Sequence, residues 1–301
     1  MCRGFIRVVI GVLVALALTA RGASVTVPNY SFESPATAFV TINIDSWQKS
    51  SKPDWYQENG GFTWVQLTGA FKNTATNSSD HIDNCDGNQA IWLFAVPEVG
   101  LFQDYDSADW RGVSNQFNAT FTPGKSYHLT VGVIGTGGGM LEGATLDLRL
   151  YYRVGSNLVN VSVTTLTNTP SVFSNNTHLV DCLVNVPAVK ARDAWAGRHI
   201  GIQFKSTVTT NLQGGYWDLD NVRLSEVTEP ALVSAAMTNG RFSFALLSEP
   251  GKAFEILSAS NLSLPVSNWT SLGLVTNTTG SNLFSEGSLG VGRFYVVKQL
   301  P

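Results

Sequence analysis

The stretch Trp-Asp-Leu-Asp-Asn-Val-Arg-Leu at residues 217–224 does most to decide the fold. Residues two apart in a β-strand share a face, so this pattern predicts that Asp220 lies on the same side as Val222 and Leu224. Those two residues are the expected core residues of the strand. A carboxylate on an apolar face is costly unless a cation or hydrogen bonds compensate it. The stretch therefore predicts a core strand whose carboxylate has a partner elsewhere in the chain.

A second motif, Asn-Tyr-Ser-Phe-Glu at residues 29–33, stands at the other end of the same region. Its Glu33 follows Phe32, which is expected to be buried, and is a candidate to share a cation with Asp220. Between the motifs, short runs mix β-branched, aromatic and polar residues, and Gly, Asn, Pro and Ser between the runs favour turns. The runs are residues 39–44, 62–67, 127–134, 145–154, 158–166 and 199–206. This pattern predicts an antiparallel β-sandwich.

The two motifs resemble the first and last strands of galactose-binding-like jelly-roll domains, a group that includes many secreted carbohydrate-binding modules. Residues 86–93 resemble an early strand of such modules, and Gln-Phe at 116–117 followed by Thr-Pro-Gly-Lys-Ser-Tyr-His-Leu at 122–129 resembles their central hairpin. The resemblance covers about residues 24–226 and implies an all-β, antiparallel jelly-roll β-sandwich. In that family the corresponding Glu and Asp often ligate a structural Ca2+, which implies Glu33 and Asp220 as metal ligands here.

A domain boundary is predicted near Glu-Val-Thr-Glu-Pro at residues 226–230. Residues 227–234 are interpreted as a linker, and residues 235–301 show a second β pattern that predicts a smaller all-β C-terminal domain. The sequences that carry a further resemblance are residues 254–262, 269–270 and 293–295. They resemble a C-terminal module found in secreted proteins of Verrucomicrobia-type bacteria, which implies a bacterial secreted protein.

The first 22 residues predict a secretory signal peptide. Arg3 and Arg7 precede an apolar run at residues 8–18, which is too short to span a bilayer comfortably. Small residues stand at the positions that a signal peptidase reads, so cleavage is expected near Gly22, with Ala23 as the alternative end. The mature chain is therefore expected to be secreted, extracellular, periplasmic or at the cell surface, with no integral membrane segment.

The composition is that of a globular protein with few charges. Of the 301 residues, 44% are hydrophobic and 14% are charged, and the formal net charge is −3. This profile suits an extracellular β protein. The chain also has no run of Lys and Arg that would hold a phosphate backbone, so we expect no nucleic-acid partner.

Cleavage of the signal peptide leaves two cysteines, Cys85 and Cys182. An even count in an oxidising compartment favours a disulfide, which would stabilise the fold by about 4 to 5 kcal/mol in the chain-entropy model. The alternative is two buried free thiols in separate strands, because a sequence does not tell whether the two Cα atoms approach within about 7 Å. Both alternatives stay open from the sequence.

No motif in the chain announces a reaction. Gly-Thr-Gly-Gly-Gly at residues 135–139 lacks the Lys-Ser/Thr of a phosphate-binding loop and is interpreted as a turn. The four histidines are scattered without ligand spacing, and the acidic runs at residues 80–87 and 104–109 are interpreted as solvated turns. The chain is therefore predicted not to be an enzyme. A glycan-acting hydrolase fits poorly, because no acid/base pair can be identified.

Aromatic side chains are the remaining signal. Trp55 and Tyr56 stand in a predicted loop beside Asp54, where rings can stack on sugar faces and carboxylates can bind sugar hydroxyls. Trp47 and Trp110 are further candidates for the same binding site, although aromatic residues also build sandwich cores. The prediction is a secreted, non-catalytic protein that binds a polysaccharide or other glycan and contains a structural Ca2+. The alternative is a structural or adhesive cell-surface protein that acts through protein contacts.

Overall fold

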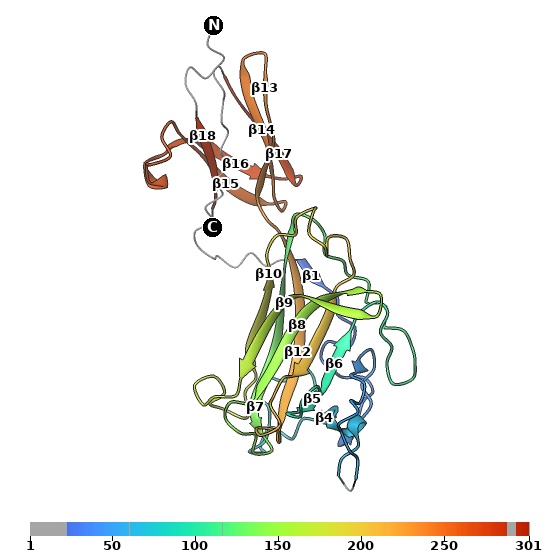
Figure 1. Cartoon of the computed structure of the whole chain (residues 1–301). Helices are drawn as coiled ribbons and strands as arrows, with labels where there is room; N and C mark the ends of the chain where they lie inside the picture. Colours follow the sequence, from blue (N-terminus) through green and yellow to red (C-terminus); the bar gives the residue numbers. More distant parts are fainter. Residues whose placement is uncertain (1–22, 60, 116, 288–292, 301) are drawn as a thin grey trace. The chain divides into compact units, whose positions relative to one another are not determined.

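The structure is a computed structural model and describes residues 23–59, 61–115, 117–287 and 293–300 (Figure 1). The predicted signal peptide lies outside these residues. The chain divides into two compact units, Ala23–Glu226 and one that contains the residues from Val227 onward. The described elements are β-strands and two short 3-10 helices, η1 (Trp64–Leu67) and η2 (Val266–Asn268). Among the described residues, no helix is long and apolar enough to cross a membrane.

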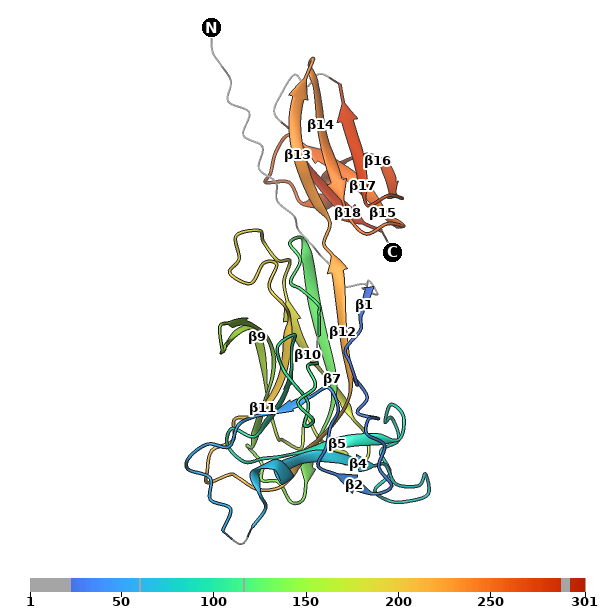
Figure 2. The same cartoon turned by 90° about the vertical axis from the view of Figure 1, so that its right-hand side faces the viewer.

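The first unit contains a seven-stranded sheet with antiparallel pairing. Its order is β10 (Val180–Val186), β7 (Lys125–Gly137), β12 (Tyr216–Thr228), β5 (Gln89–Phe94), β4 (Thr68–Lys72) and β2 (Val40–Thr41), and β1 (Ala23–Val25) pairs with β12. Figure 2 shows β5, β4 and β2 side by side. In the pairing of β12 with β5, Tyr216 lies opposite Phe94 and Asp218 lies opposite Trp92.

A second, five-stranded sheet covers one face of the first. Its order is β3 (Gln48–Lys49), β6 (Gly100–Gln103), β11 (Gly201–Ser206), β8 (Thr145–Val154) and β9 (Asn157–Thr167). Strand β8 alternates as the sequence predicts, because Leu146 and Leu148 are core residues. Asp147 and Arg149 form an ion pair at 2.7 Å. Strict period-two patterning therefore aligns β8 with its apolar face inward.

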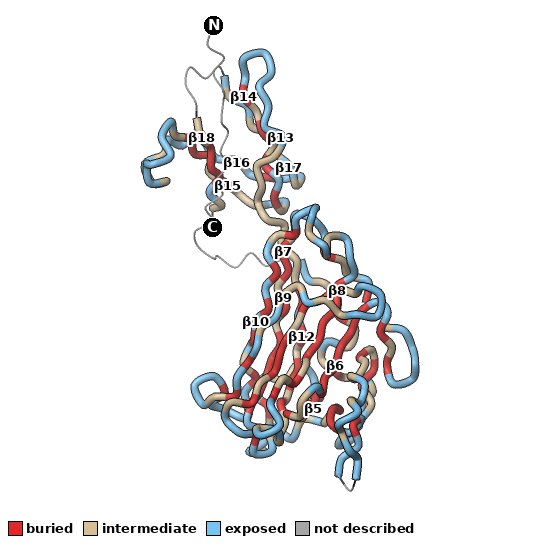
Figure 3. The backbone as a smooth tube through the Cα atoms, viewed as in Figure 1, coloured by how far each residue is buried: buried red, intermediate tan, exposed pale blue. Residues whose placement is uncertain are grey.

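The main core lies between these two sheets. Figure 3 shows buried backbone along the strands of both. Trp47 is 1% exposed and stacks on Phe204 of β11, with ring centroids 5.2 Å apart. Trp217 of β12 is fully buried and meets Phe173 edge to face at 5.5 Å. Each such ring stabilises the fold by roughly 1.5 to 3 kcal/mol through burial alone. The predicted all-β antiparallel sandwich is confirmed.

Strand β12 does not alternate strictly, because one residue has a left-handed backbone. Asn221 has a φ of 55°. Leu219 before it and Val222 after it both pack into the main core, and a step of three residues between two inward side chains requires an extra residue, as in a β-bulge. Asp220 therefore lies on the outward face of the sheet. The prediction that Asp220 shares a face with Val222 and Leu224 is wrong.

A smaller apolar cluster lies on that outward face. Its buried members come from the loop before β5 and from three segments of the sheet region: Ile82, Ala90, Ile134 and Leu179. Phe71 and Cys85 pack against them. Ile82 and Cys85 belong to the loop at residues 73–88, so this cluster holds that loop on the sheet. We call it the outer cluster.

The second unit is also built from two sheets. One has the order β13 (Ala231–Thr238), β14 (Arg241–Leu247), β17 (Ser281–Glu286), and the other has the order β16 (Thr270–Asn277), β15 (Lys252–Ala259), β18 (Phe294–Gln299). Apolar side chains of β14, β15 and β18 form its own core: Phe242, Phe244, Leu246, Phe254, Ile256, Tyr295 and Val297. The predicted smaller all-β fold of this part is confirmed.

Candidate active site

The outward face of the seven-stranded sheet carries a carboxyl group among aromatic rings. Tyr216 and Asp218 alternate with the core residues of β12, so their side chains point away from the main core. Their cross-strand neighbours on β5, Phe94 and Trp92, alternate with core residues in the same way, and Phe94 also packs in part against the main core. Two paired strands therefore bring one acid and three aromatic side chains onto a single face.

Asp218 is a partly buried acid without a counter-charge. Its Oδ1 atom is inaccessible to solvent and has no hydrogen-bond partner among the described residues. No Lys, Arg or His of the described chain forms an ion pair with it. Burial disfavours the charged form and raises the pKa of Asp218 to about 8. Asp218 is therefore a neutral carboxylic acid at pH 7, and it can donate a proton.

Three aromatic rings contact one another in succession beside this acid, each tilted to the next, and we call Phe62, Phe94 and Tyr216 the aromatic row. The ring centroids of Phe62 and Phe94 are 5.2 Å apart, and those of Phe94 and Tyr216 are 5.9 Å apart. Phe62 comes from the loop before η1 and is 56% exposed. The row thus begins at solvent and ends at the strand that carries Asp218.

Glycines on β7 and in the turn after it make room for the ring of Tyr216. A Cβ atom on Gly137 would lie 2.5 Å from this ring, and one on Gly138 would lie 2.7 Å from it. Burial, followed by the negative charges of Asp218 and Asp80, raises the pKa of Tyr216. The phenol therefore keeps its proton and presents a neutral hydroxyl group.

The ring of Trp92 is held in place next to Asp218. Its Nε1 atom donates a hydrogen bond to the carbonyl oxygen of Gln66 in η1, at 3.0 Å. The ring crosses Gly69, its partner on β4, where a Cβ atom would lie 2.3 Å from it. Lys49 steadies η1, because its ammonium group donates hydrogen bonds to the carbonyl oxygens of Val65 and Thr68. Trp92 is therefore a fixed wall of the site.

The two predicted calcium ligands do approach a common segment. Glu33 accepts hydrogen bonds from the backbone amides of Asn88 and Gln89, both at 2.7 Å, and Asp220 accepts one from the amide of Asp86 at 2.7 Å. Burial raises the pKa of Asp220 to about 7. The described residues contain no group of three or more His, Cys, Asp and Glu side chains arranged around a metal. Calcium at Glu33 and Asp220 stays a prediction, and the backbone contacts give both carboxylates a structural role of their own.

The predicted glycan-stacking loop packs on itself. Trp55 meets Tyr56 edge to face at 5.7 Å, and its Nε1 atom donates to Oε1 of Glu98 at 2.9 Å. Tyr56 is partly buried, and its hydroxyl donates to the carbonyl oxygen of Phe62 at 2.8 Å. The carbonyl of Asp54 accepts a hydrogen bond from Gln57 within the loop. These contacts support the segment that carries Phe62 into the aromatic row.

The other two predicted ligand-binding tryptophans lie elsewhere. Trp47 is buried in the main core and donates a hydrogen bond from Nε1 to the carbonyl oxygen of Asn29, so the prediction that it contacts a ligand is wrong. Trp110 is exposed, but its Nε1 atom donates to Oδ1 of Asp45 at 2.8 Å and Arg111 lies over its ring. Neither residue belongs to the face that carries Asp218.

Both cysteines are free thiols, so the structure contains no disulfide between them. Cys182 of β10 is part of the main core, whereas Cys85 packs against the outer cluster. These two apolar clusters lie on opposite faces of the seven-stranded sheet, which keeps the sulfur atoms apart. Of the two alternatives from the sequence, the bridge is wrong and free thiols are correct, although Cys85 is only partly buried and lies in a loop and not in a strand.

We expect that denaturing the unreduced protein in the presence of iodoacetamide alkylates both Cys85 and Cys182 to completion. Without denaturant the reaction should be slow, because burial raises the pKa of Cys182 to about 11 and that of Cys85 still further, so little thiolate is present. Peptide mass spectrometry measures both extents. A crosslinked peptide pair that disappears only after reduction would contradict this expectation.

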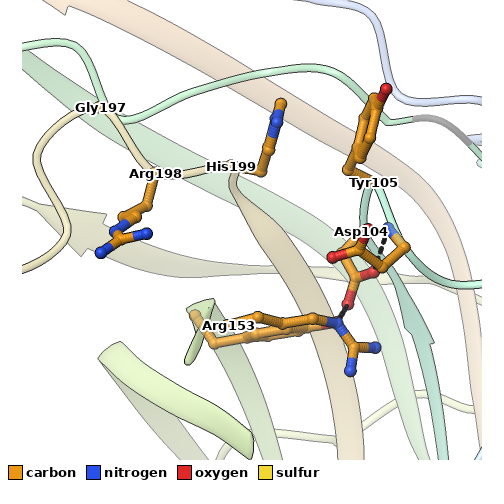
Figure 4. Close-up of a pocket in the computed structure, with 8 residues that line it drawn as sticks. Asp104, Tyr105, Arg153, Gly197, Arg198 and His199 are labelled. Atoms are coloured by element: carbon orange, nitrogen blue, oxygen red, sulfur yellow. Dashed lines mark hydrogen bonds and ion pairs between the residues drawn. The ribbon is translucent and has the colours of Figure 1, made fainter. Parts of the chain in front are cut away.

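A cavity of about 340 Å3 lies beside the five-stranded sheet (Figure 4). Asp104, directly after β6, forms four hydrogen bonds at the cavity. Its Oδ1 atom accepts hydrogen bonds from the backbone amides of Asp106 and Ser107, and its Oδ2 atom accepts them from the hydroxyl of Tyr151 and Nε of Arg153. These four hydrogen bonds use the whole accepting capacity of a carboxylate. The sequence-based interpretation of residues 104–109 as a solvated turn is therefore wrong for Asp104, whose side chain is buried (3% exposed).

Sequence reasoning overlooked Asp218. The signal was present, because Asp218 stands between the core residues Trp217 and Leu219, and period two places it outward beside Tyr216. The sequence does not tell which strand pairs with β12, and that pairing supplies Phe94. The cavity could not be predicted for a similar reason, because its lining residues come from three segments that are distant in the sequence.

Comparison with known proteins identifies a family for the first unit. A family model described as HpiC1-like, HpiC1 cyclase, matches residues 23–225. A solved cyclase from Fischerella sp. TAU is similar at 20% identity over 70% of this chain and 100% of that chain, with a TM-score of 0.50, which supports the fold. A cyclase from the same source in complex with 4-(1H-indol-3-yl)butan-2-one is 22% identical over 69% of this chain and 98% of that chain, with a TM-score of 0.48. No curated protein matches the chain.

These matches correct the predicted function. A non-catalytic carbohydrate-binding protein is wrong, and so are the glycan partner and the prediction that the chain is not an enzyme, because the sandwich matches a family of cyclases. The resemblance to galactose-binding-like domains holds only as far as an all-β sandwich, and the family match gives no support to calcium. The resemblance of the C-terminal part stays a prediction, because the match ends at residue 225. Since the match spans more than half of the 301 residues, the chain belongs to the HpiC1-like family.

Proposed function

We propose that the first unit is a cyclase that uses Asp218 as the proton donor for ring closure in a small aromatic molecule. The observation that carries this proposal is a carboxyl group whose buried Oδ1 atom has no partner among the described residues and which lies beside a row of aromatic rings. General acids work best when their pKa lies near the working pH, and a pKa of about 8 meets that condition at neutral pH. An acid whose pKa is strongly raised by burial is also a candidate for a functional site.

The proposed reaction is an isomerisation that needs no other reactant. Asp218 transfers its proton to a carbon–carbon π-bond of the substrate, which leaves a carboxylate on Asp218 and a carbocation on the substrate. A second π-bond of the same molecule supplies the electron pair for the new carbon–carbon bond and closes the ring. The cation then loses a proton to the carboxylate of Asp218. Substrate and product have the same atoms, and the acid is restored.

The aromatic row suits such a reaction in two ways. The π-faces of Phe94 and Tyr216 stabilise a positive charge that develops beside them, by roughly 0.5 to 2 kcal/mol each. Flat rings also bind a flat, apolar substrate by stacking and displace water from it. The partial burial of Asp218 means that the carboxylate left after proton transfer is poorly solvated, so return of the proton is favoured.

An indole-bearing molecule is the proposed substrate class. The similar Fischerella cyclases contain 4-(1H-indol-3-yl)butan-2-one in one structure and (3Z)-3-(1-methyl-2-pyrrolidinylidene)-3H-indole in another. The aromatic row of this chain supports the same class, since an indole ring stacks well on Phe and Tyr. The former compound is a suitable binding probe.

Replacing Phe62 by Ala should weaken the binding of 4-(1H-indol-3-yl)butan-2-one by roughly three- to tenfold, the worth of one aromatic contact. Phe62 is the exposed end of the aromatic row, so its loss removes stacking surface and little core. Titration followed by NMR measures the affinity.

Phe39→Ala is the matched control, because Phe39 is 77% exposed and contacts no other ring among the described residues. The control should bind the probe as tightly as the natural protein. Equal affinity in the Phe62 and Phe39 variants would show that the aromatic row is not the binding surface.

Export of the mature enzyme is part of the proposal. It rests on the charged start, the short apolar run at residues 8–18 and the small residues near Gly22. Mass spectrometry of the protein recovered from its producing cells would show a new N-terminus near Ala23 if the signal is removed. An intact Met1 would contradict export by this route.

A further inference from the structure

The cavity beside the five-stranded sheet has cationic groups that the proposed cyclase chemistry does not use. It is lined by Asp104, Tyr105, Asp106, Tyr151, Arg153, Gly197, Arg198 and His199. Asp218 and the aromatic row are not among these residues. We propose that the cavity is a second binding site, for a small organic anion that joins a carboxylate to a planar ring, with Arg153 and Arg198 as the groups that hold the carboxylate.

Arg153 is a guanidinium fixed in position with donors to spare. Its Nε atom donates to Oδ2 of Asp104 at 2.7 Å, and its plane lies over the ring of Phe102 at 5.7 Å. Nη1 reaches the carbonyl oxygen of Ser156 at 3.5 Å, and the guanidinium also interacts with the hydroxyl group of Tyr151, but Nη2 forms no hydrogen bond of ordinary geometry among the described residues and remains a free donor. A guanidinium that is already ordered loses little entropy when it binds a carboxylate, and it binds with two parallel donors.

Arg198 supplies the second charge. Its side chain is exposed, and no carboxylate of the described chain lies within ion-pair distance of it. Asp104 and Asp106 are the lining acids, and the charge of Asp104 is offset by its ion pair with Arg153. Asp106 is exposed, so solvent screens its charge, whereas the pinned Arg153 is only 21% exposed. The free donors in the cavity therefore favour an anion.

Two stacked aromatic rings line the cavity and favour a planar ligand. The rings of Tyr105 and His199 are stacked, with centroids 4.4 Å apart and planes within 8°. Figure 4 shows these two rings along one side of the view, with Arg153 below them and Arg198 to the side. The volume of about 340 Å3 falls in the range of small-molecule sites and exceeds what a simple inorganic ion needs.

Calorimetric titration of the full chain with benzoate and with benzamide tests the proposal. The two probes have the same shape and differ in charge, so benzoate should bind at least about tenfold more tightly. Arg198→Gln should lower the affinity for benzoate about tenfold, and Arg192→Gln, an exposed arginine that does not line the cavity, should leave it unchanged. Arg153→Gln should lower the affinity too, with folding checked because Asp104 then loses its cation.

The proposal would be overturned by no binding of benzoate, by equal affinity for benzoate and benzamide, or by unchanged affinity in Arg198→Gln. Asp218→Asn separates this site from the proposed active site and should bind benzoate normally. Loss of benzoate binding in Asp218→Asn would place the anion at the outward face of the seven-stranded sheet and would also overturn the proposal. The readout does not depend on turnover, so failure of the cyclase proposal leaves this test intact.

Discussion

Replacing Asp218 by Asn should abolish proton transfer and, at the same time, make the protein more stable at neutral and alkaline pH. Asn has nearly the same shape and cannot ionise. For the reaction, loss of a general acid removes a factor of about 10² to 10⁴ in rate. The natural protein should also lose activity as the pH rises through about 8, because its acid then gives up the proton.

The stability effect follows from proton linkage. The ordinary pKa of an Asp is 3.8, and in the folded chain the pKa of Asp218 is raised to about 8. Between these values the folded chain binds a proton that the unfolded chain releases, so the free energy of unfolding falls as the pH rises, by up to about 1.4 kcal/mol per pH unit. Asp218→Asn removes this decrease of the free energy of unfolding with pH, because Asn does not ionise. Asp220, with a folded pKa of about 7, contributes a fall of the same sign, which remains in the variant.

Two measurements check the Asp218→Asn prediction. Deuterium uptake from D2O into the indole carbons of 4-(1H-indol-3-yl)butan-2-one, followed by NMR, reports proton transfer without a known substrate. Urea unfolding at pH 5, 7 and 8.5 reports stability, and Asp54→Asn in an exposed loop controls for the loss of one charge. If the variant and the natural protein have the same free energy of unfolding at each pH, or exchange deuterium equally fast, Asp218 does not have its proposed role.

Replacing Gly69 by Ala should lower the free energy of unfolding by about 1 to 3 kcal/mol, the usual cost of overpacking a tight site. The added Cβ would lie 2.3 Å from the ring of Trp92 and 2.5 Å from the backbone carbonyl oxygen of Thr41. The ring can move only by losing its hydrogen bond to Gln66, and the carbonyl belongs to the paired strand β2 and cannot move without the sheet. For a domain of this size we expect a fall of several °C in Tm, roughly 2 to 4 °C per kcal/mol.

Gly61→Ala is the matched control for this substitution. Gly61 is exposed, and nothing lies within 4 Å of the Cβ that would be added. The control should be as stable as the natural protein or slightly more stable, because Ala restricts the unfolded chain. If the Gly69 and Gly61 variants unfold at the same temperature, the close approach of Trp92 to β4 is not a constraint on the fold.

The fold could be predicted from the sequence because its strands alternate. In β8, Leu146 and Leu148 alternate with Asp147 and Arg149, and one buried face fixes the orientation of the strand. The prediction from alternation was wrong in β12, where the backbone of one residue departs from the regular strand. Asn221, with positive φ, shifted the phase of β12 and moved Asp220 to the other face, and nothing in the side chain of Asn221 requires that shift.

The candidate site could be predicted only in part, because it depends on pairing between distant strands. Asp218 meets Trp92 and Phe94 only through the register of β12 with β5, and Phe62 reaches them from a loop. Trp47 shows a second reason. Aromatic residues occur both in cores and in binding sites, and only the packing of Trp47 against Phe204 in the structure assigns it to the core.

The bulge at Asn221 constrains how the family can change this strand over time. Deleting Asn221 would act on strand pairing as a frameshift acts on codons: Val222 and Leu224 would still face the main core, but Leu224 would slip by one residue from its partner Val25 on β1 while Asp218 stayed paired with β5. The half of the strand that bears Asp218 and the half that bears Val222 can therefore drift by substitution but not by gain or loss of a single residue. We expect relatives to differ freely in length in the loops around β12 and to keep the spacing from Asp218 to Leu224 invariant.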